Sequence, residues 1–408
     1  MATRAPSPWR SRRFRYFAAG NLLNNIGETM YAFALPLLVL SISGSLTQMA
    51  ALIAVSPIIF AAASPILGHI VDKWGSKVLV VPGLLLQLGA SVALNIVLLN
   101  GVSALGVLFL AEILVQFGSN CYRAGWMAGV RAMFPDNAGR SRATLTTLFQ
   151  ISLMAGPALA AVLVGSLGFP GLLWLNSATF LAPLIVWFVG INPAAAQAVH
   201  APTPSSVVES MRAGARELWK MDGIARTTMF MMVPLALVFS PGTTALFVFA
   251  ATTNAHSSAA QVGLMLALAN GFGVAASIAT SELPKWNIRP LGYLCMSGVA
   301  ASLAMLGFTS SALAMTALMA IFFACNNALI VASNLTVFEE IPQHAAGRIL
   351  GFWRLLVGVP GAVAPIAIAA VGESVHLAVI FGALATIALT TMLGVGVYHR
   401  RIGAGIPP

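Results

Sequence analysis

Charged residues are scarce in this chain. Only 8% of its 408 residues are Asp, Glu, Lys or Arg, whereas 59% are hydrophobic. Because a soluble domain carries about 25% charged residues, this chain has too little charge to cover a water-facing surface. A soluble enzyme, a secreted disulfide scaffold and a disordered protein are therefore excluded.

Motifs for catalysis and for metal binding are lacking as well. The sequence has no GxxxxGK[ST] phosphate loop, no HExxH pair and no GxSxG elbow. Its three cysteines, Cys121, Cys295 and Cys325, each lie inside an apolar run, where they are expected to act as small packing residues. The sequence thus predicts a protein that is not an enzyme and that has no cofactor, no metal site and no ATP motor.

Long apolar runs are what the chain has in abundance. They are twice the ~10 residues of an outer-membrane barrel strand and do not alternate, whereas a spanning helix needs about 20 mainly apolar residues. Twelve such runs lie near residues 15–40, 47–70, 77–99, 103–131, 142–167, 171–191, 227–251, 259–282, 291–309, 311–337, 349–371 and 375–398. We predict an all-α polytopic membrane protein with twelve transmembrane helices.

Lysine and arginine recur in small groups between these runs. They give a net charge of +10 but form no patch with interleaved aromatic residues, so no nucleic-acid partner is expected. Every second connection carries them, in the groups Arg4–Arg15, Lys73 and Lys77, Arg140 and Arg142, Arg212–Arg226, Lys285 and Arg289, Arg348, and Arg400 and Arg401. The positive-inside rule then places both termini in the cytoplasm, and we expect a bacterial inner membrane.

An internal repeat divides the chain into two halves. Arg140 precedes Pro157 by 17 positions, and Arg348 precedes Pro365 by the same number. The pattern predicts pseudo-symmetric six-helix halves at 1–191 and 227–408, with the binding site between them near the midplane.

The linker at 192–226 begins with Pro and Ser and then becomes amphipathic. One face carries Val208, Met211, Ala215 and Leu218, and basic residues surround the other. This pattern is typical of a helix on the membrane surface, although a solvated linker helix has the same pattern.

The connection after the second run carries a signature. Gly68, Asp72, Lys73, Gly75 and Lys77 stand in the order Gly-x-x-x-Asp-Lys-x-Gly-x-Lys. This segment resembles the gating loop of the major facilitator superfamily, and the resemblance covers essentially the whole chain. It implies the twelve-helix fold of that superfamily, with alternating access gated at this loop.

Further segments are similar to one branch of that superfamily, the exporters of drugs, macrolides and siderophores. They are Gly27-Glu28 followed by Ala34–Leu38, the linker stretch Met211–Trp219, and Gly156-Pro157, which matches part of the antiporter signature. The branch usually has Asp in place of Glu28. In many drug antiporters, an Arg stands roughly where this chain has Glu112, so proton coupling through that Arg does not carry over.

Polar residues form stripes inside the predicted spans. Asn21, Asn24, Asn25 and Glu28 share one helix face, and so do Glu112, Gln116, Asn120 and Arg123. The resemblance implies that both helices line the cavity of the first half. In the second half, the candidates for the cavity are Asn326, Asn327 and Arg354.

The two carboxylates are candidates for proton coupling, because burial favours a neutral carboxyl group and a nearby Arg favours an ionised one. We expect Glu28 to be the main protonation site and Glu112 the second, although the same residues suit a structural network between helices. Arg123 and Arg354 suit either an ion pair or attraction of an anionic substrate.

The sequence therefore favours a monomeric secondary transporter that exports an amphipathic small molecule, a drug or a siderophore-like metabolite, in exchange for protons. Its partners would be that substrate, protons and the lipid bilayer. Uptake of a polar nutrient and a non-transporting membrane sensor are the alternatives.

Overall fold

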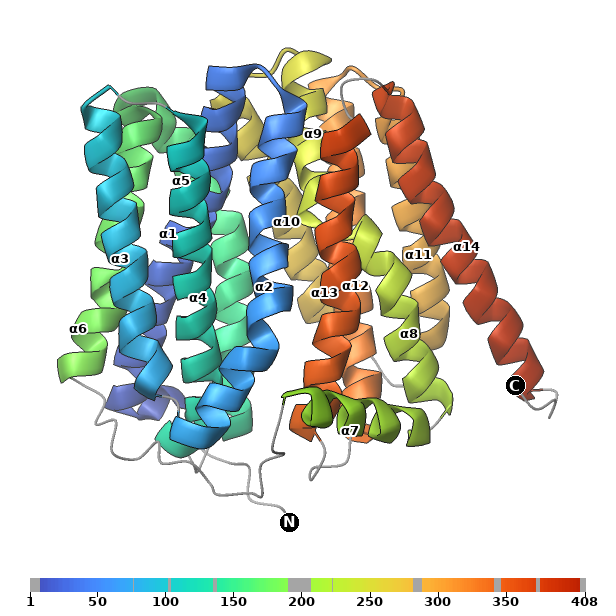
Figure 1. The fold of residues 1–408 in the computed structure, drawn as a ribbon. Coiled ribbons are helices and arrows are strands. Elements are labelled where there is room, and N and C mark those ends of the chain that lie inside the picture. The colour runs from blue at the N-terminus through green and yellow to red at the C-terminus, as the bar shows by residue number, and fades with distance from the viewer. Residues whose placement is uncertain are drawn as a thin grey trace. The chain divides into compact units, whose positions relative to one another are not determined.

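The structure is a computed structural model. It describes residues 8–75, 77–101, 104–134, 138–189, 207–221, 223–281, 288–340, 346–371 and 375–403. Within these residues, the regular structure is entirely helical (Figure 1). The helices are α1 (Arg12–Ser43), α2 (Leu46–Trp74), α3 (Lys77–Leu99), α4 (Leu105–Met133), α5 (Ala138–Thr179), α6 (Leu181–Val189), α7 (Val207–Lys220), α8 (Gly223–Val238), α9 (Pro241–Thr253), α10 (Ala259–Ser281), α11 (Ile288–Leu306), α12 (Ala312–Glu340), α13 (Ala346–Val371) and α14 (Leu377–Gly403), and η1 (Pro8–Arg10) is a short 3₁₀ turn.

Within the described residues, each predicted span is mainly helical, so the predicted fold class is confirmed. Ten stretches of the described residues are long and apolar enough to cross a membrane, and one of them, Thr147–Val189, holds two predicted spans. The shorter apolar helix Pro290–Leu306 supplies the remaining one.

The local sequence accounts for two breaks in the helices, one between the predicted spans 142–167 and 171–191 and one inside the span 227–251. Within α5, Gly168 has φ 64°, a left-handed conformation that favours glycine, and Pro170 follows. The predicted span 227–251 consists of two helices, because Ser240 is extended and Pro241 starts α9. The Thr243 hydroxyl donates to the carbonyl of Val238 across that break, at 2.6 Å.

The end of α2 differs from the expected loop. The helix runs on to Trp74, so Gly68, Asp72 and Lys73 belong to its last turns, and the side chains of Asp72 and Lys73 lie outside the described residues. Gly75, which is buried with φ 82°, makes the turn, and Lys77 begins α3. The gating role of this segment stays a prediction.

The chain splits into two compact units. The first comprises residues 1–44 and 58–207, and the second comprises residues 45–57 and 208–408. In the first unit, α1 packs against α5, and α3 packs against α4. In the second, α12 packs between α10 and α11, while α8 contacts α13 and α14.

Helix α7 covers one end of helices of the second unit. It lies across the ends of α8 and α13, roughly at right angles to them (Figure 1). Leu218 is fully buried among Ala225, Met229 and Ile349, whereas Val208 of the same predicted face is 58% exposed. Only the C-terminal part of the predicted apolar face is therefore packed, and contact with a membrane surface stays a prediction.

Candidate functional site

Glu28, in the middle of α1, is the centre of a polar cluster in the first unit. Its Oε2 atom lies 3.1 Å from Nη2 of Arg123 on α4. Its Oε1 atom accepts hydrogen bonds from Ser119 Oγ and from Asn24 Nδ2, each at 3.0 Å. Three donors from two helices, one of them charged, thus hold this carboxylate in place.

Arg123 contacts both the Glu28 carboxylate and an aromatic ring. Its guanidinium carbon lies 5.0 Å from the centre of the Phe149 ring on α5. The Arg123 side chain is 37% exposed, whereas Glu28 is 15% exposed. Arg123 stands ten positions before the end of α4, a distance of about 15 Å along the helix. An arginine at that depth is costly in lipid. The ion pair with Glu28 offsets part of that cost.

Glu112, also on α4, has a different environment. Its side chain is buried, and its Oε1 atom accepts a hydrogen bond from Gln116 Nε2 at 2.9 Å. Tyr31 of α1 is the other polar neighbour, but neither the Tyr31 hydroxyl nor Glu112 Oε2 has a hydrogen-bond partner among the described residues. No described Lys, Arg or His pairs with this carboxylate. A buried carboxyl group without a cation is far less costly when it is neutral.

The remaining polar residues of these two helices bond mostly within their own helix. Asn25 Nδ2 donates to Asn21 Oδ1 at 2.8 Å, and both side chains are buried. Asn120 Nδ2 donates to the carbonyl of Gln116 at 2.9 Å. Asn24 stands one turn before Glu28 on α1 and is the asparagine of that helix that donates to it.

The candidates in the second unit lie on α12 and α13. Asn326 is buried, and its Oδ1 atom has no partner among the described residues. Asn327 Nδ2 donates to the carbonyl of Phe323 at 2.9 Å and lies against Gly273 of α10. Arg354 is half-buried on α13.

A second buried polar cluster of the first unit was missed from the sequence. The hydroxyl groups of Ser91 and Ser177 lie 2.6 Å apart, and Asn95 Nδ2 donates to Ser177 Oγ at 2.9 Å, so α3 is tied to α5. Asn176, which precedes Ser177, and Gln87, one turn before Ser91, are fully buried. Each has at least one polar atom without a hydrogen-bond partner among the described residues. The four-residue spacing of Gln87, Ser91 and Asn95 in the span 77–99 was the available signal.

Comparison with models of known protein families identifies the family of this chain. The model of the Major Facilitator Superfamily matches residues 17–365. This chain belongs to that superfamily. It is therefore a multi-pass membrane transporter, and the superfamily is not one of enzymes.

Solved structures agree with this fold. The chain is similar to a bacterial homologue of the iron transporter ferroportin in an inward-facing state, with TM-score 0.65 and 16% identity over 95% of this chain and 97% of that one. It is also similar to a mutant of the nucleoside transporter NupG, with TM-score 0.69 and 13% identity over 94% and 98%. Identities this low show the fold alone. No curated protein sequence matches the chain.

Proposed function

We propose that this superfamily member exports an amphipathic small molecule, a drug or a siderophore-like metabolite, in exchange for protons. It would reside in a bacterial inner membrane with both termini in the cytoplasm, as the alternation of basic connections favours. The observation that carries the proposal is a pair of carboxylates on α1 and α4, Glu28 and Glu112, in opposite electrostatic environments.

Glu112 is the proton carrier in this proposal, ahead of Glu28. It is buried without a described cation and has one unpaired oxygen, so its proton leaves when water or a cation reaches it. Glu28 already has Arg123 to balance its charge. This order reverses the one expected from the sequence, because Arg123 pairs with Glu28 and not with Glu112.

Glu28 and Arg123 serve as the substrate-sensing pair. The exposed part of Arg123 faces water in preference to lipid, because a lipid-facing guanidinium is costly. The Phe149 ring beneath the guanidinium adds an apolar surface beside the charge, which suits an amphipathic molecule. A substrate that competes for Arg123 would loosen the Glu28 contact and change the packing of α1 on α4.

Transport in proteoliposomes tests this assignment. Glu112→Gln is expected to abolish substrate-induced proton flux but to keep substrate binding, whereas Glu28→Gln is expected to weaken binding as well. Glu217→Gln on α7 is the matched control, because that carboxylate pairs with Lys220 outside the spans. Normal proton flux in Glu112→Gln would contradict the assignment.

Uptake of a polar nutrient is the second candidate, and the buried amides favour it. Asn21, Asn25 and Asn326 are at most 8% exposed, and the similar NupG structure is a nucleoside transporter. A substrate panel should contain lipophilic drugs, siderophores and nucleosides. Accumulation of a nucleoside that is driven by an inward proton gradient, with no response to drugs or siderophores, would favour uptake.

A further inference from the structure

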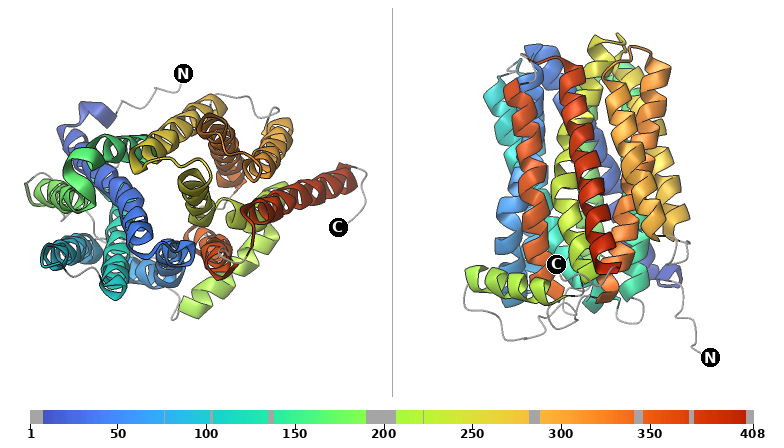
Figure 2. Two further views of the ribbon diagram at one scale, coloured as in Figure 1. Left: turned by 90° about the horizontal axis from the view of Figure 1, so that it is seen from above. Right: turned by 90° about the vertical axis from the view of Figure 1, so that its right-hand side faces the viewer.

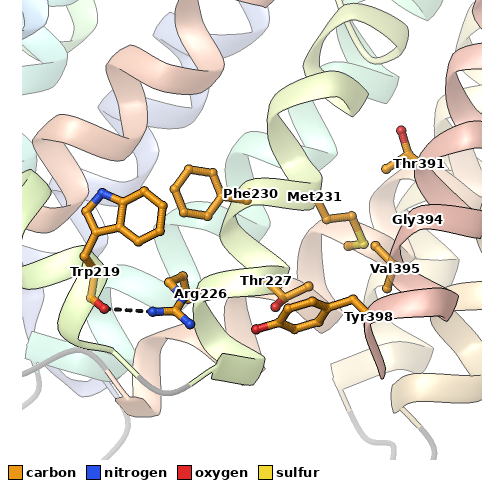
Figure 3. Close-up of a pocket in the computed structure, with 9 residues that line it drawn as sticks. All are labelled: Trp219, Arg226, Thr227, Phe230, Met231, Thr391, Gly394, Val395 and Tyr398. Carbon is orange, nitrogen blue, oxygen red and sulfur yellow. Dashed lines mark hydrogen bonds between the residues drawn. The ribbon is translucent and has the colours of Figure 1, made fainter. Parts of the chain in front are cut away.

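A cavity of about 410 Å³ lies within the second unit. It is open on one side and is lined by residues of α7, α8 and α14 (Figure 3). Its walls are mainly apolar, and the residues that matter for its chemistry are Trp219, Arg226, Phe230, Met231, Val395 and Tyr398.

The cavity lies at the level where the spans end. The apolar stretch of α8 and α9 begins at Ala225, and that of α14 ends at Tyr398. Arg226, Trp219 and Tyr398 therefore stand at the membrane–water boundary, where aromatic residues and arginine are favoured. Phe230 is one turn further along α8, about 6 Å deeper, and the wall of α14 continues inward from Tyr398. The cavity thus has a polar mouth and an apolar interior.

The cavity opens between α8 and α14, two membrane-spanning helices that supply most of its lining residues. Towards its C-terminal end, α14 leans away from the neighbouring helices of its unit (Figures 1 and 2). On either side of the cavity residues of α14, Leu393 is 62% exposed and Val397 is 54% exposed. Exposed aliphatic side chains on a spanning helix face lipid, so a lipid chain can enter this opening from the bilayer.

Arg226 gives the mouth its charge. Its Nη1 atom donates to the carbonyl of Trp219 at 2.9 Å, and its guanidinium carbon lies 5.7 Å from the centre of the Trp219 ring (Figure 3). Among the described residues, no carboxylate pairs with it. Because a guanidinium has five N–H donors, this contact fixes its position and leaves donors for an anion.

We propose that this cavity binds one anionic phospholipid, with its phosphate at Arg226 and one acyl chain between α8 and α14. The polar mouth, the apolar interior and the lateral opening match the order of groups in such a lipid. The exposed basic residues Arg212 and Arg216 of α7 add to the attraction of an anionic membrane surface. The bound lipid would fix α7 against the ends of α8 and α14.

Quenching of Trp219 fluorescence by brominated lipid tests the proposal. The protein is placed in nanodiscs that contain brominated phosphatidylglycerol or, at the same mole fraction, brominated phosphatidylcholine. The Trp219 signal is the difference between the native chain and Trp219→Phe. An attraction of about 1 kcal/mol per basic residue gives an expected preference of about fivefold for phosphatidylglycerol.

Two pairs of variants test separately the charge of Arg226 and the space for an acyl chain beside Gly394. Arg226→Gln is expected to remove the lipid preference, whereas Arg216→Gln, with the same loss of charge outside the cavity, keeps it. Gly394→Leu is expected to lower quenching by both lipids, because a side chain there meets open space within the cavity. Gly382→Leu on the same helix also meets open space but lies outside the cavity, so quenching is unchanged.

Three results would overturn the proposal. Equal quenching by the two lipids in the native chain would show that the site does not select an anion. Displacement of phosphatidylglycerol by millimolar inorganic phosphate would show a site for free phosphate. Full quenching in a folded Gly394→Leu variant would show that no acyl chain occupies the cavity, even if Arg226→Gln failed to fold.

Discussion

Each unit contains a pair of helices that cross closely at a glycine, but the glycine lies on different helices of the two pairs. In the first, Gly156 of α5 lies so close to Thr29 of α1 that a Cβ atom there would clash with its side chain. In the second, Gly242 lies on α9, and a Cβ atom there would be 3.0 Å from Cα of Pro365 on α13. The internal repeat aligns Gly156-Pro157 with Ala364-Pro365. The close crossing is therefore kept in both halves, while the small residue that permits it changes helix.

The chemistry of the two units differs more than their packing. The spans of the first unit contain the ion pair of Glu28 and Arg123 between α1 and α4, and the buried Glu112 on α4. In the second unit, the polar residues of α12 include the amides Asn326 and Asn327, which the internal repeat aligns closely with Asn120 of α4. The carboxylate candidates therefore lie in the first unit, whereas the candidates of the second unit are two amides and Arg354, and the predictions below compare the two sets.

The largest effect on stability is expected from Arg123→Gln. The change leaves Glu28 without a cation and should lower the free energy of unfolding by about 2–4 kcal/mol. This cost does not exceed that of breaking a fully buried pair, because Arg123 is partly exposed. Thermal unfolding in detergent measures it. The double variant with Glu28→Gln should recover most of the loss, and a double variant as unstable as Arg123→Gln would contradict the ion pair.

Gly156→Ala should come next, at about 1–3 kcal/mol, because the new methyl group meets Thr29 and the backbone of Met30. Gly242→Ala should have a similar cost in the second unit. Gly165→Ala on α5 is the control, since a Cβ atom there has nothing within 4 Å. Equal melting temperatures for Gly156→Ala and Gly165→Ala would argue against the close crossing.

Asn24→Leu and Asn326→Leu compare the amides of the two halves. Asn24 donates to Glu28, so its loss should cost about 1–2 kcal/mol. Asn326 has an unpaired buried oxygen among the described residues, so its replacement should be neutral or stabilising. Chemical unfolding of both variants checks this order, and a larger cost for Asn326→Leu would point to a partner for that amide.

The smallest effect is expected from single hydroxyl groups. Ser177→Ala removes two hydrogen bonds between α3 and α5 and should cost about 1 kcal/mol. The buried Ser302 of α11 donates to the carbonyl of Val299 in its own helix, so Ser302→Ala should change stability little. The difference between the two melting temperatures is the measurement, and its absence would show that the α3–α5 cluster adds no stability.

The fold was predictable because the bilayer imposes it on any chain of this composition. A run of 20 apolar residues must satisfy its backbone groups internally, so helices at the twelve predicted segments required no tertiary information. The polar stripes of α1 and α4 were likewise readable, because a helix places residues three and four apart on one face. Helical periodicity predicted Glu28 and Arg123 as candidates, but not as partners.

Pairing and burial were decided by the tertiary structure alone. Residues 28 and 123 are 95 positions apart, and the packing of α1 and α4 determines which carboxylate the arginine reaches. That packing gives Glu28 a cation and leaves Glu112 with Tyr31 and Gln116. The sequence by itself determined which segments form apolar helices and which of their faces are polar, because the first follows from local composition and the second from helical periodicity. Only the tertiary structure decided which carboxylate has a cation beside it, because the packing of distant segments sets the neighbours of a buried charge.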